Sequence, residues 1–434
     1  MVTAGITQSR DVAPVLGHAI GRLDSWLETM RQPGGYGGPV SHWWRSQFRY
    51  TGPGVDWRYE GLLAGYSILW EKTTDERWKR RLNVAARDVL AAQAPDGSYQ
   101  ASQFEQNPGS LGTPHEAAAS LGLLRALNHL DDPDLALAAV GRSVSNLIAT
   151  LWDTRGSCFN DSPGAVGRVP NKLATLAALL MELWQVRPDD SLLAYARACL
   201  DCVLDYQVAD GPLCGGIHQF APDAAHGDSR FFPYYIARCI PPLVRAAELL
   251  DAPRYAVAAA AALRFVRETM NGDGGWPQII YGNGRRVEFP RWIAAAGDIL
   301  HAFTALGQPV PESARRRLLA GQSPGGGFRT ANGFSPNHGA PRLPDAPDVR
   351  DVLPCAGWND KAFRYLAEEL PAHAVVEPVQ TADTYRVDIA CDGRATFEES
   401  SESMTVLDCA GRPLYRWRKS EPWASCTTDI EGLP

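Results

Sequence analysis

Two kinds of helical pattern alternate along the chain. In the first kind, apolar residues recur three and four positions apart between charged residues, as in 77–92, 192–206 and 254–270. This is the pattern of helices with one face in solvent. The second kind is rich in Ala, Gly and Leu and has few polar residues, as in 116–124. Such helices are expected to be buried, so the alternation predicts an outer and an inner layer of helices.

A glycine-rich turn recurs after each outer helix and predicts the architecture. Its forms include Gln-Ala-Pro-Asp-Gly-Ser-Tyr at 93–99 and Asn-Gly-Asp-Gly-Gly-Trp at 271–276. A fixed spacing of this kind is typical of a repeat protein. The marker residues are Gly35, Gly97, Gly156, Gly215, Gly275 and Gly326, at intervals of 62, 59, 59, 60 and 51 residues.

Each turn leads through a loop to an inner helix, and four of these six helices have proline at their start, where no backbone N–H is needed. The expected starts are Asp56, Pro114, Pro170, Pro233, Pro290 and Gly357. Six outer and six inner helices predict an all-α (α/α)6 toroid, closed head to tail, in a catalytic domain of residues 1–372. An open helical solenoid is the alternative.

The pattern changes after residue 372. Short alternating runs separated by turn residues predict strands at 385–391, 394–398, 403–407 and 414–417. Residues 373–434 are therefore expected to form a small β-rich appendage.

Composition excludes two classes of protein. The chain of 434 residues has a formal net charge of −7, which disfavours a nucleic-acid binder, and no apolar run is long enough for a membrane span. Charged residues interrupt the first 26 positions where a signal peptide needs an apolar centre, and the nine cysteines are an odd number. Both features favour a cytoplasmic protein with reduced thiols.

The repeated Gln-x-x-Asp-Gly turn resembles that of the terpenoid cyclase and protein prenyltransferase toroids, and many polysaccharide lyases and glycoside hydrolases share the implied six-hairpin barrel. The string Gly-Gly-Trp-Pro-Gln at 274–278 also resembles a stretch in one pectate lyase family. The Asp-x-Asp-Asp motif of class II cyclases and the zinc ligands of prenyltransferases do not occur in the sequence. We therefore predict no metal site and no organic cofactor, and leave a divalent cation such as calcium open.

Polar residues at the inner-helix starts should meet at one mouth of the toroid, with aromatic residues between them. Five of the six starts carry a cation, which predicts a positive mouth and an anionic saccharide or other small-molecule substrate. The cations are Arg58, Lys172, Arg238, Arg291 and Lys361. In the alternative, they pair in a structural ring with Asp56, Glu60, Glu116, Asp298 and Asp360. The predicted substrate contacts are Trp44, Arg58, Glu60, His115, Lys172, Trp276, Arg291, Trp358 and Asp360.

The lyase resemblance implies β-elimination from a uronate-containing saccharide: Asn or Arg neutralises the carboxylate, and His or Tyr transfers protons. The residues of these types that we assign to catalysis are Asn171, His218, Tyr235 and Arg238. A glycoside hydrolase would instead need two carboxylates, from Glu60, Glu116, Asp228, Asp298 or Asp360. A terpenoid cyclase-like enzyme acting on a prenyl or phosphorylated substrate, and a non-catalytic toroid that binds a partner, are further alternatives.

Overall fold

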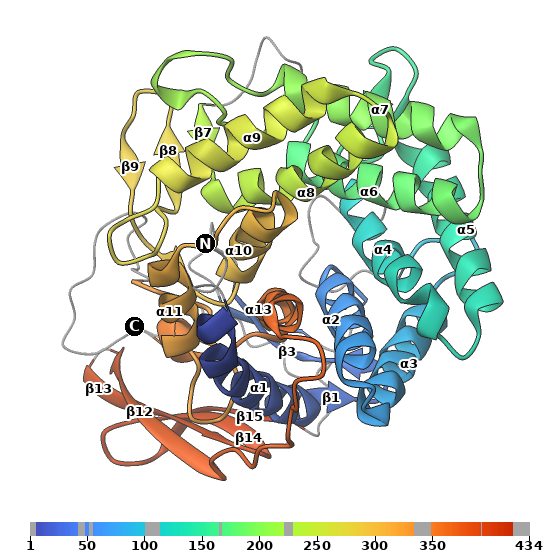
Figure 1. The fold of residues 1–434 in the computed structure, drawn as a ribbon. Helices are drawn as coiled ribbons and strands as arrows, with labels where there is room; N and C mark the ends of the chain where they lie inside the picture. The colour runs from blue at the N-terminus through green and yellow to red at the C-terminus, as the bar shows by residue number, and fades with distance from the viewer. Residues whose placement is uncertain are drawn as a thin grey trace.

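Two rings of helices form most of the molecule (Figure 1). The computed structural model describes residues 6–41, 48–51, 55–99, 113–164, 167–220, 229–333, 349–391 and 393–419. The inner helices are α2 (Arg58–Thr73), α4 (Ala117–Ala126), α6 (Pro170–Val186), α8 (Pro233–Leu249), α10 (Ala296–Ala305) and α13 (Ala356–Glu369). The outer helices are α1 (Ile6–Thr29), α3 (Glu76–Ala91), α5 (Pro133–Leu151), α7 (Asp190–Asp205), α9 (Pro253–Glu268) and α11 (Glu312–Ala320).

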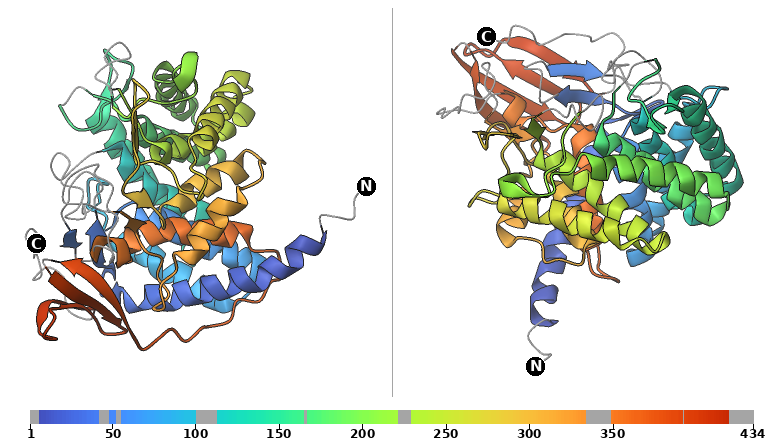
Figure 2. Two further views of the ribbon diagram at one scale, coloured as in Figure 1. Left: turned by 90° about the vertical axis from the view of Figure 1, so that its left-hand side faces the viewer. Right: turned by 90° about the horizontal axis from the view of Figure 1, so that it is seen from above.

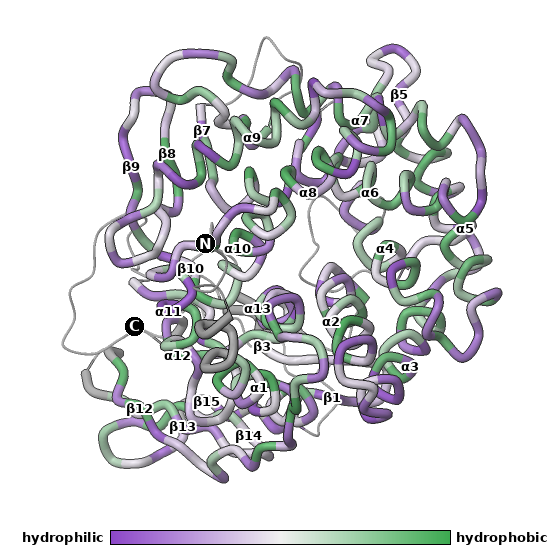
Figure 3. The backbone as a smooth tube through the Cα atoms, in the orientation of Figure 1, coloured by the Kyte–Doolittle hydropathy of each residue, from purple (hydrophilic) through white to green (hydrophobic). Residues whose placement is uncertain are grey.

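The inner ring is closed. Each inner helix packs against the next one along the chain, and α13 packs against α2. The prediction of a closed all-α toroid is therefore confirmed, and the open solenoid is excluded. Hydrophobic residues are frequent on inner helix α4, whereas hydrophilic residues are frequent on outer helix α3 (Figure 3).

Short strands in the connecting turns gather at one end of the barrel, opposite the end from which α1 projects (Figure 2). They form small antiparallel ladders. The paired strands are β1 (Arg31–Gln32) with β2 (Gly35–Tyr36), β3 (Gly38–Ser41) with β4 (Phe48–Thr51), β5 (Trp152–Asp153) with β6 (Cys158–Phe159), and β7 (Arg230–Phe231) with β8 (Ile279–Tyr281), which also pairs with β9 (Arg286–Val287). Short helical segments are η1 (Pro114–Glu116), η2 (Leu127–His129), η3 (Gly211–Leu213) and α12 (Val349–Val352).

One inner helix begins later than predicted. Pro290 does not start a helix, because Arg291 and Trp292 form strand β10 and pair with β11 (Ala331–Asn332) of the following turn. Helix α10 therefore begins at Ala296, and Asp298 lies in its first turn. This pairing joins segments about forty residues apart in the sequence. The proline at position 290 is a local feature and does not predict such a pairing.

Glycine allows two neighbouring inner helices to approach closely. A Cβ atom added to Gly61 of α2 would lie 2.5 Å from the backbone oxygen of Asp360 in α13. Real Cβ contacts of this length do not occur, so one helix would have to move.

We expect Gly61→Ala to lower the free energy of unfolding by about 1–3 kcal/mol, because it overpacks this contact. Urea denaturation would measure the change. Gly141→Ala on outer helix α5 is the matched control, since its Cβ would meet only the Arg187 guanidinium at 3.5 Å. The control should be neutral or slightly stabilising, as is usual for this change in a helix. Equal effects of the two changes would contradict the close-packing argument.

The C-terminal strands form one antiparallel sheet in the order β12 (Thr384–Cys391), β13 (Gly393–Ser400), β14 (Ser403–Leu407) and β15 (Pro413–Arg418). This confirms the predicted appendage. The sheet is attached to α1: the Trp26 indole donates to Glu399 at 2.8 Å, and Lys419 pairs with the same carboxylate at 2.9 Å. The boundary between residues 372 and 373 stays a prediction. Among the described residues, no helix is long and apolar enough to cross a membrane.

Candidate functional site

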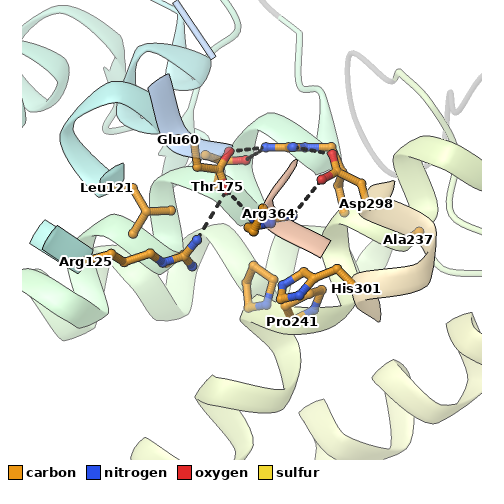
Figure 4. A pocket seen from close by; sticks show the side chains of 12 residues that line it. Glu60, Leu121, Arg125, Thr175, Ala237, Pro241, Asp298, His301 and Arg364 are labelled. Atoms are coloured by element: carbon orange, nitrogen blue, oxygen red, sulfur yellow. Dashed lines mark hydrogen bonds and ion pairs between the residues drawn. The ribbon is translucent and has the colours of Figure 1, made fainter. Parts of the chain in front are cut away.

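Four charged side chains on the barrel axis form a closed ring of ion pairs, which we call the ion tetrad. It consists of Glu60, Arg238, Asp298 and Arg364, from four different inner helices. Figure 4 labels Glu60, Asp298 and Arg364. Arg238 lies 2.7 Å from Glu60 and 2.6 Å from Asp298. Arg364 lies 3.1 Å from Glu60 and 2.6 Å from Asp298. Two cations thus neutralise two anions, as burial of charge requires.

Neighbouring groups make further contacts with the carboxylate oxygens of the tetrad. The Tyr234 hydroxyl donates to Asp298 at 3.0 Å, and Arg125 reaches Glu60 at 3.4 Å from the rim of a narrow polar pocket. Burial alone would raise the pKa of both tetrad carboxyls, but Arg238 and Arg364 outweigh it. They hold the pKa of Asp298 at about 2 and that of Glu60 well below its usual range.

These shifts predict acid sensitivity. Because the folded-state pKa of Asp298 is below its unfolded value of about 4, its ionised form contributes stability above that pH, which is lost as the pH falls towards 2. The contribution of Asp298 is roughly 2–3 kcal/mol. Urea denaturation of the wild type and of Asp298→Asn at pH 6 and pH 3 isolates the loss, because other titrating groups such as Asp360 are common to both proteins. The difference in stability between the two proteins should shrink at pH 3, and the tetrad argument fails if it is the same at both pH values.

Asp360 shows the opposite behaviour. It is fully buried, and burial raises its pKa to about 8 although the Lys361 ammonium lies 2.6 Å away. Its protonated form contributes stability that is full below about pH 4 and is lost as the pH rises towards 8.

An aromatic layer lies at the inner-helix starts. The Trp358 ring is its centre, with centroids of Trp57 at 6.1 Å, Tyr234 at 5.8 Å and Trp292 at 4.9 Å. His115 stacks on Trp57 at 5.5 Å. Tyr235 continues the layer from Tyr234 at 5.2 Å. Five of the six units contribute, and the Tyr234 hydroxyl joins the layer to the ion tetrad.

Members of the aromatic layer differ in exposure. Trp57, Trp358 and Tyr234 are buried, whereas His115, Tyr235 and Trp292 are half-buried. The latter three are the layer side chains that a bound molecule can contact directly.

All five predicted mouth cations have carboxylate partners. The pairs are Arg58 with Asp56 (2.7 Å), Lys172 with Asp161 (2.9 Å), Arg238 with Glu60 and Asp298, Arg291 with Asp273 (2.8 Å) and Glu288 (2.9 Å), and Lys361 with Asp360 (2.6 Å). The expected uncompensated positive mouth is therefore wrong, and the paired alternative describes most of these residues. The partners Asp56, Glu60, Asp298 and Asp360 are buried at the inner helices, where an unpaired charge would be costly. The partners of Lys172 and Arg291 are partly exposed.

Several predicted site residues lie elsewhere than expected. Trp276 is 5% exposed, and its indole donates to the Val266 carbonyl of α9 at 2.8 Å, so it is a core residue. Arg238 is in the tetrad and does not face a substrate carboxylate. Arg291 lies outside the aromatic layer, and Trp44 is outside the described residues.

The remaining catalytic candidates surround the layer. Asn171 begins α6, and its side-chain oxygen is buried without a hydrogen-bond partner in the described part of the chain. His218 is half-buried and lies against Phe231 with centroids 4.8 Å apart. Of the hydrolase candidates, Glu116 is half-buried in η1 and Asp228 is outside the described residues.

The sequence analysis missed Arg364, which lies in the third turn of α13. A signal existed, since an arginine inside a helix predicted to be buried needs an anionic partner. Within the ranges that the structure describes, no group of three His, Cys, Asp or Glu side chains could hold a metal ion.

The sequence matches no protein-family model and no curated protein. Solved structures share the fold. Cellobiose 2-epimerase from Spirochaeta thermophila is 14% identical with a TM-score of 0.61, over 85% of this chain and 98% of that one. A D-mannose isomerase is 11% identical with a TM-score of 0.59, over 85% and 99%. Unsaturated glucuronyl hydrolase from a Bacillus species is 14% identical with a TM-score of 0.57, over 82% and 95%. The chain therefore has the (α/α)6-toroid fold of these enzymes.

Proposed function

We propose that the chain is an enzyme that acts on a saccharide at the aromatic layer. Solved structures with the same fold include enzymes named for cellobiose, mannose and unsaturated glucuronyl substrates. The half-buried Trp292 ring supports the assignment, because a flat indole can stack on the apolar face of a sugar ring.

The proposed chemistry is proton transfer at a carbon next to a carbonyl or carboxylate group. One observation carries it: His115 and Tyr235 are half-buried in the aromatic layer, whereas the tetrad carboxylates below are buried in ion pairs. Imidazole and phenol groups are common general acids and bases. The proton-abstraction step is shared by epimerisation, aldose–ketose isomerisation and β-elimination, so uronate elimination stays one form of the proposal.

In this proposal Arg238 is a positioning residue. It holds Asp298, which accepts from Tyr234, and Tyr234 packs against both Tyr235 and Trp358. Through Asp298, Arg238 would therefore fix the position and orientation of the Tyr234 ring in the aromatic layer.

The other reactions have less support. Hydrolysis needs a pair of accessible carboxyl groups. Of the candidates that the structure describes, Glu60, Asp298 and Asp360 are buried and Glu116 alone is half-buried. A terpenoid cyclase needs an apolar cavity, and the barrel axis is occupied by the charged tetrad.

The test is incubation in D2O with cellobiose, mannose and galacturonate or glucuronate oligomers, each with and without calcium. Deuterium next to the carbonyl carbon, followed by NMR, would support epimerisation or isomerisation. An ultraviolet-absorbing unsaturated product would support β-elimination. New reducing ends without exchange, or no sugar product at all, would overturn the proposal.

A further inference from the structure

A second hollow lies on the outer rim of the fifth and sixth units. It contains about 920 Å³ of space, is open to solvent and is lined by the 272–273 turn, helix α11 and residues next to β11. Its charged lining residues are Asp273, Arg316, Arg317 and Arg329. We call it the arginine groove.

The arginine groove is separate from the aromatic layer. Side chains alternate across a strand, so Arg291 and Trp292 of β10 point to opposite faces. Trp292 stacks on Trp358 in the layer, while Arg291 pairs with Asp273 at the edge of the groove. Strand β10 thus stands between the two sites.

Arginines outnumber carboxylates among the residues that line the arginine groove. A single carboxylate oxygen, Asp273 Oδ2, lies 2.8 Å from Arg291 and 2.8 Å from Arg317. Arg317 otherwise donates to the neutral side-chain oxygen of Asn332. Burial, together with the neighbouring Arg291 charge, lowers the pKa of Arg317 despite Asp273. Asp273 is therefore shared between two guanidinium groups, of which Arg291 has a second partner in Glu288 at 2.9 Å.

Two more arginines add to this excess. Arg329 makes no ion pair with any residue that the structure describes, and its backbone is fixed by a hydrogen bond to Gly321 and a bridge to Pro354. Arg316 is 73% exposed, and its ion pair with Glu312 is long, at 3.9 Å. Three arginines against one aspartate line the groove of a chain whose overall charge is negative.

We propose that the arginine groove binds an oxyanion, namely the phosphate or carboxylate group of a small ligand, with Arg329 and Arg316 as its main contacts. Planar guanidinium forks match both groups in two-point hydrogen bonds. The site does not depend on the proposed saccharide chemistry, because no residue of the aromatic layer lines it.

Calorimetric titration with inorganic phosphate and with acetate, at constant ionic strength set by chloride, tests the proposal. We expect saturable binding of at least one of the two anions, weakened at least tenfold in Arg329→Gln. Tighter binding of phosphate would identify a phosphorylated ligand, and tighter binding of acetate a carboxylate ligand. The control is Arg254→Gln on α9, whose guanidinium is exposed and paired with Asp201; it should bind as the wild type does.

A thermal unfolding scan of Arg329→Gln guards against misfolding, and its midpoint should stay at the wild-type value. If Arg329→Gln unfolds at a lower temperature than the wild type, Arg316→Gln is the variant to test. Arg316 lines the same groove from an exposed position, and we expect its loss to weaken anion binding threefold or more. Absence of saturable binding by the wild type, or binding unchanged in a folded Arg329→Gln protein, would overturn the proposal. Neither result bears on the saccharide assay.

Discussion

Asp298→Asn should lower the free energy of unfolding by about 3–5 kcal/mol, the usual effect of removing one partner from a buried ion pair. The substitution keeps the shape of the side chain but removes the charge that both Arg238 and Arg364 contact at 2.6 Å. Two buried guanidinium groups would then share Glu60, and Arg364 would keep a distant contact with Glu368 at 4.0 Å. Burial gives them no water to replace the lost partner, so the cost is large.

Urea denaturation at pH 7 would measure this loss. The matched control is Asp201→Asn, which removes an aspartate from an ion pair with Arg254 whose side chains are 44% and 52% exposed. Exposed pairs contribute less than about 1 kcal/mol, so the control should be nearly neutral. If the two substitutions cost the same, the tetrad is not a structural centre of the barrel.

The fold was predictable because its signals are local and repeated. Glycine turns at intervals near sixty residues and proline at inner-helix starts each specify one hairpin, and six hairpins close a ring. The late start of α10 was not predictable, since β10 forms by pairing with β11.

The sequence predicted which types of residue lie at the site, but not which of them contact one another. Lys172, Arg238 and Lys361 do lie at or near helix starts, but their partners come from sequence positions that local patterns do not relate. Glu60 and Arg238, for example, are 178 residues apart and 2.7 Å apart in space. A count of cations therefore predicted a positive mouth, whereas the folded chain has paired charges there.

Trp276 illustrates the same limit for aromatic residues. The position of Trp276 in a glycine-rich turn predicted that it lines a cavity. Its indole instead packs beside α9 and donates a hydrogen bond to the Val266 carbonyl. Trp358, in contrast, lies in the aromatic layer, because the first turn of an inner helix faces the barrel axis. Whether a buried ring lies in the aromatic layer or against an outer helix depends on tertiary packing, which the sequence pattern does not contain.

Removing the two groups proposed to transfer protons, His115 and Tyr235, should have the largest effect on activity. We expect His115→Phe and Tyr235→Phe each to lower turnover roughly 10²–10⁴-fold, the usual contribution of a general acid or base. Both changes keep a ring, so stacking on Trp57 and packing against Tyr234 are retained. The free energy of unfolding should therefore change little.

The measurement is the rate of deuterium exchange or product formation with the saccharide that the D2O assay identifies, as separate kcat and KM values. A group that acts in the chemical step lowers kcat, whereas one that only contacts the sugar raises KM. The control is His129→Phe, since His129 lies in η2 with its ring 2.7 Å from Glu71, outside the aromatic layer. Normal kcat in both layer variants would remove His115 and Tyr235 from the mechanism and transfer the assignment to His218, the other half-buried imidazole predicted at this end of the barrel.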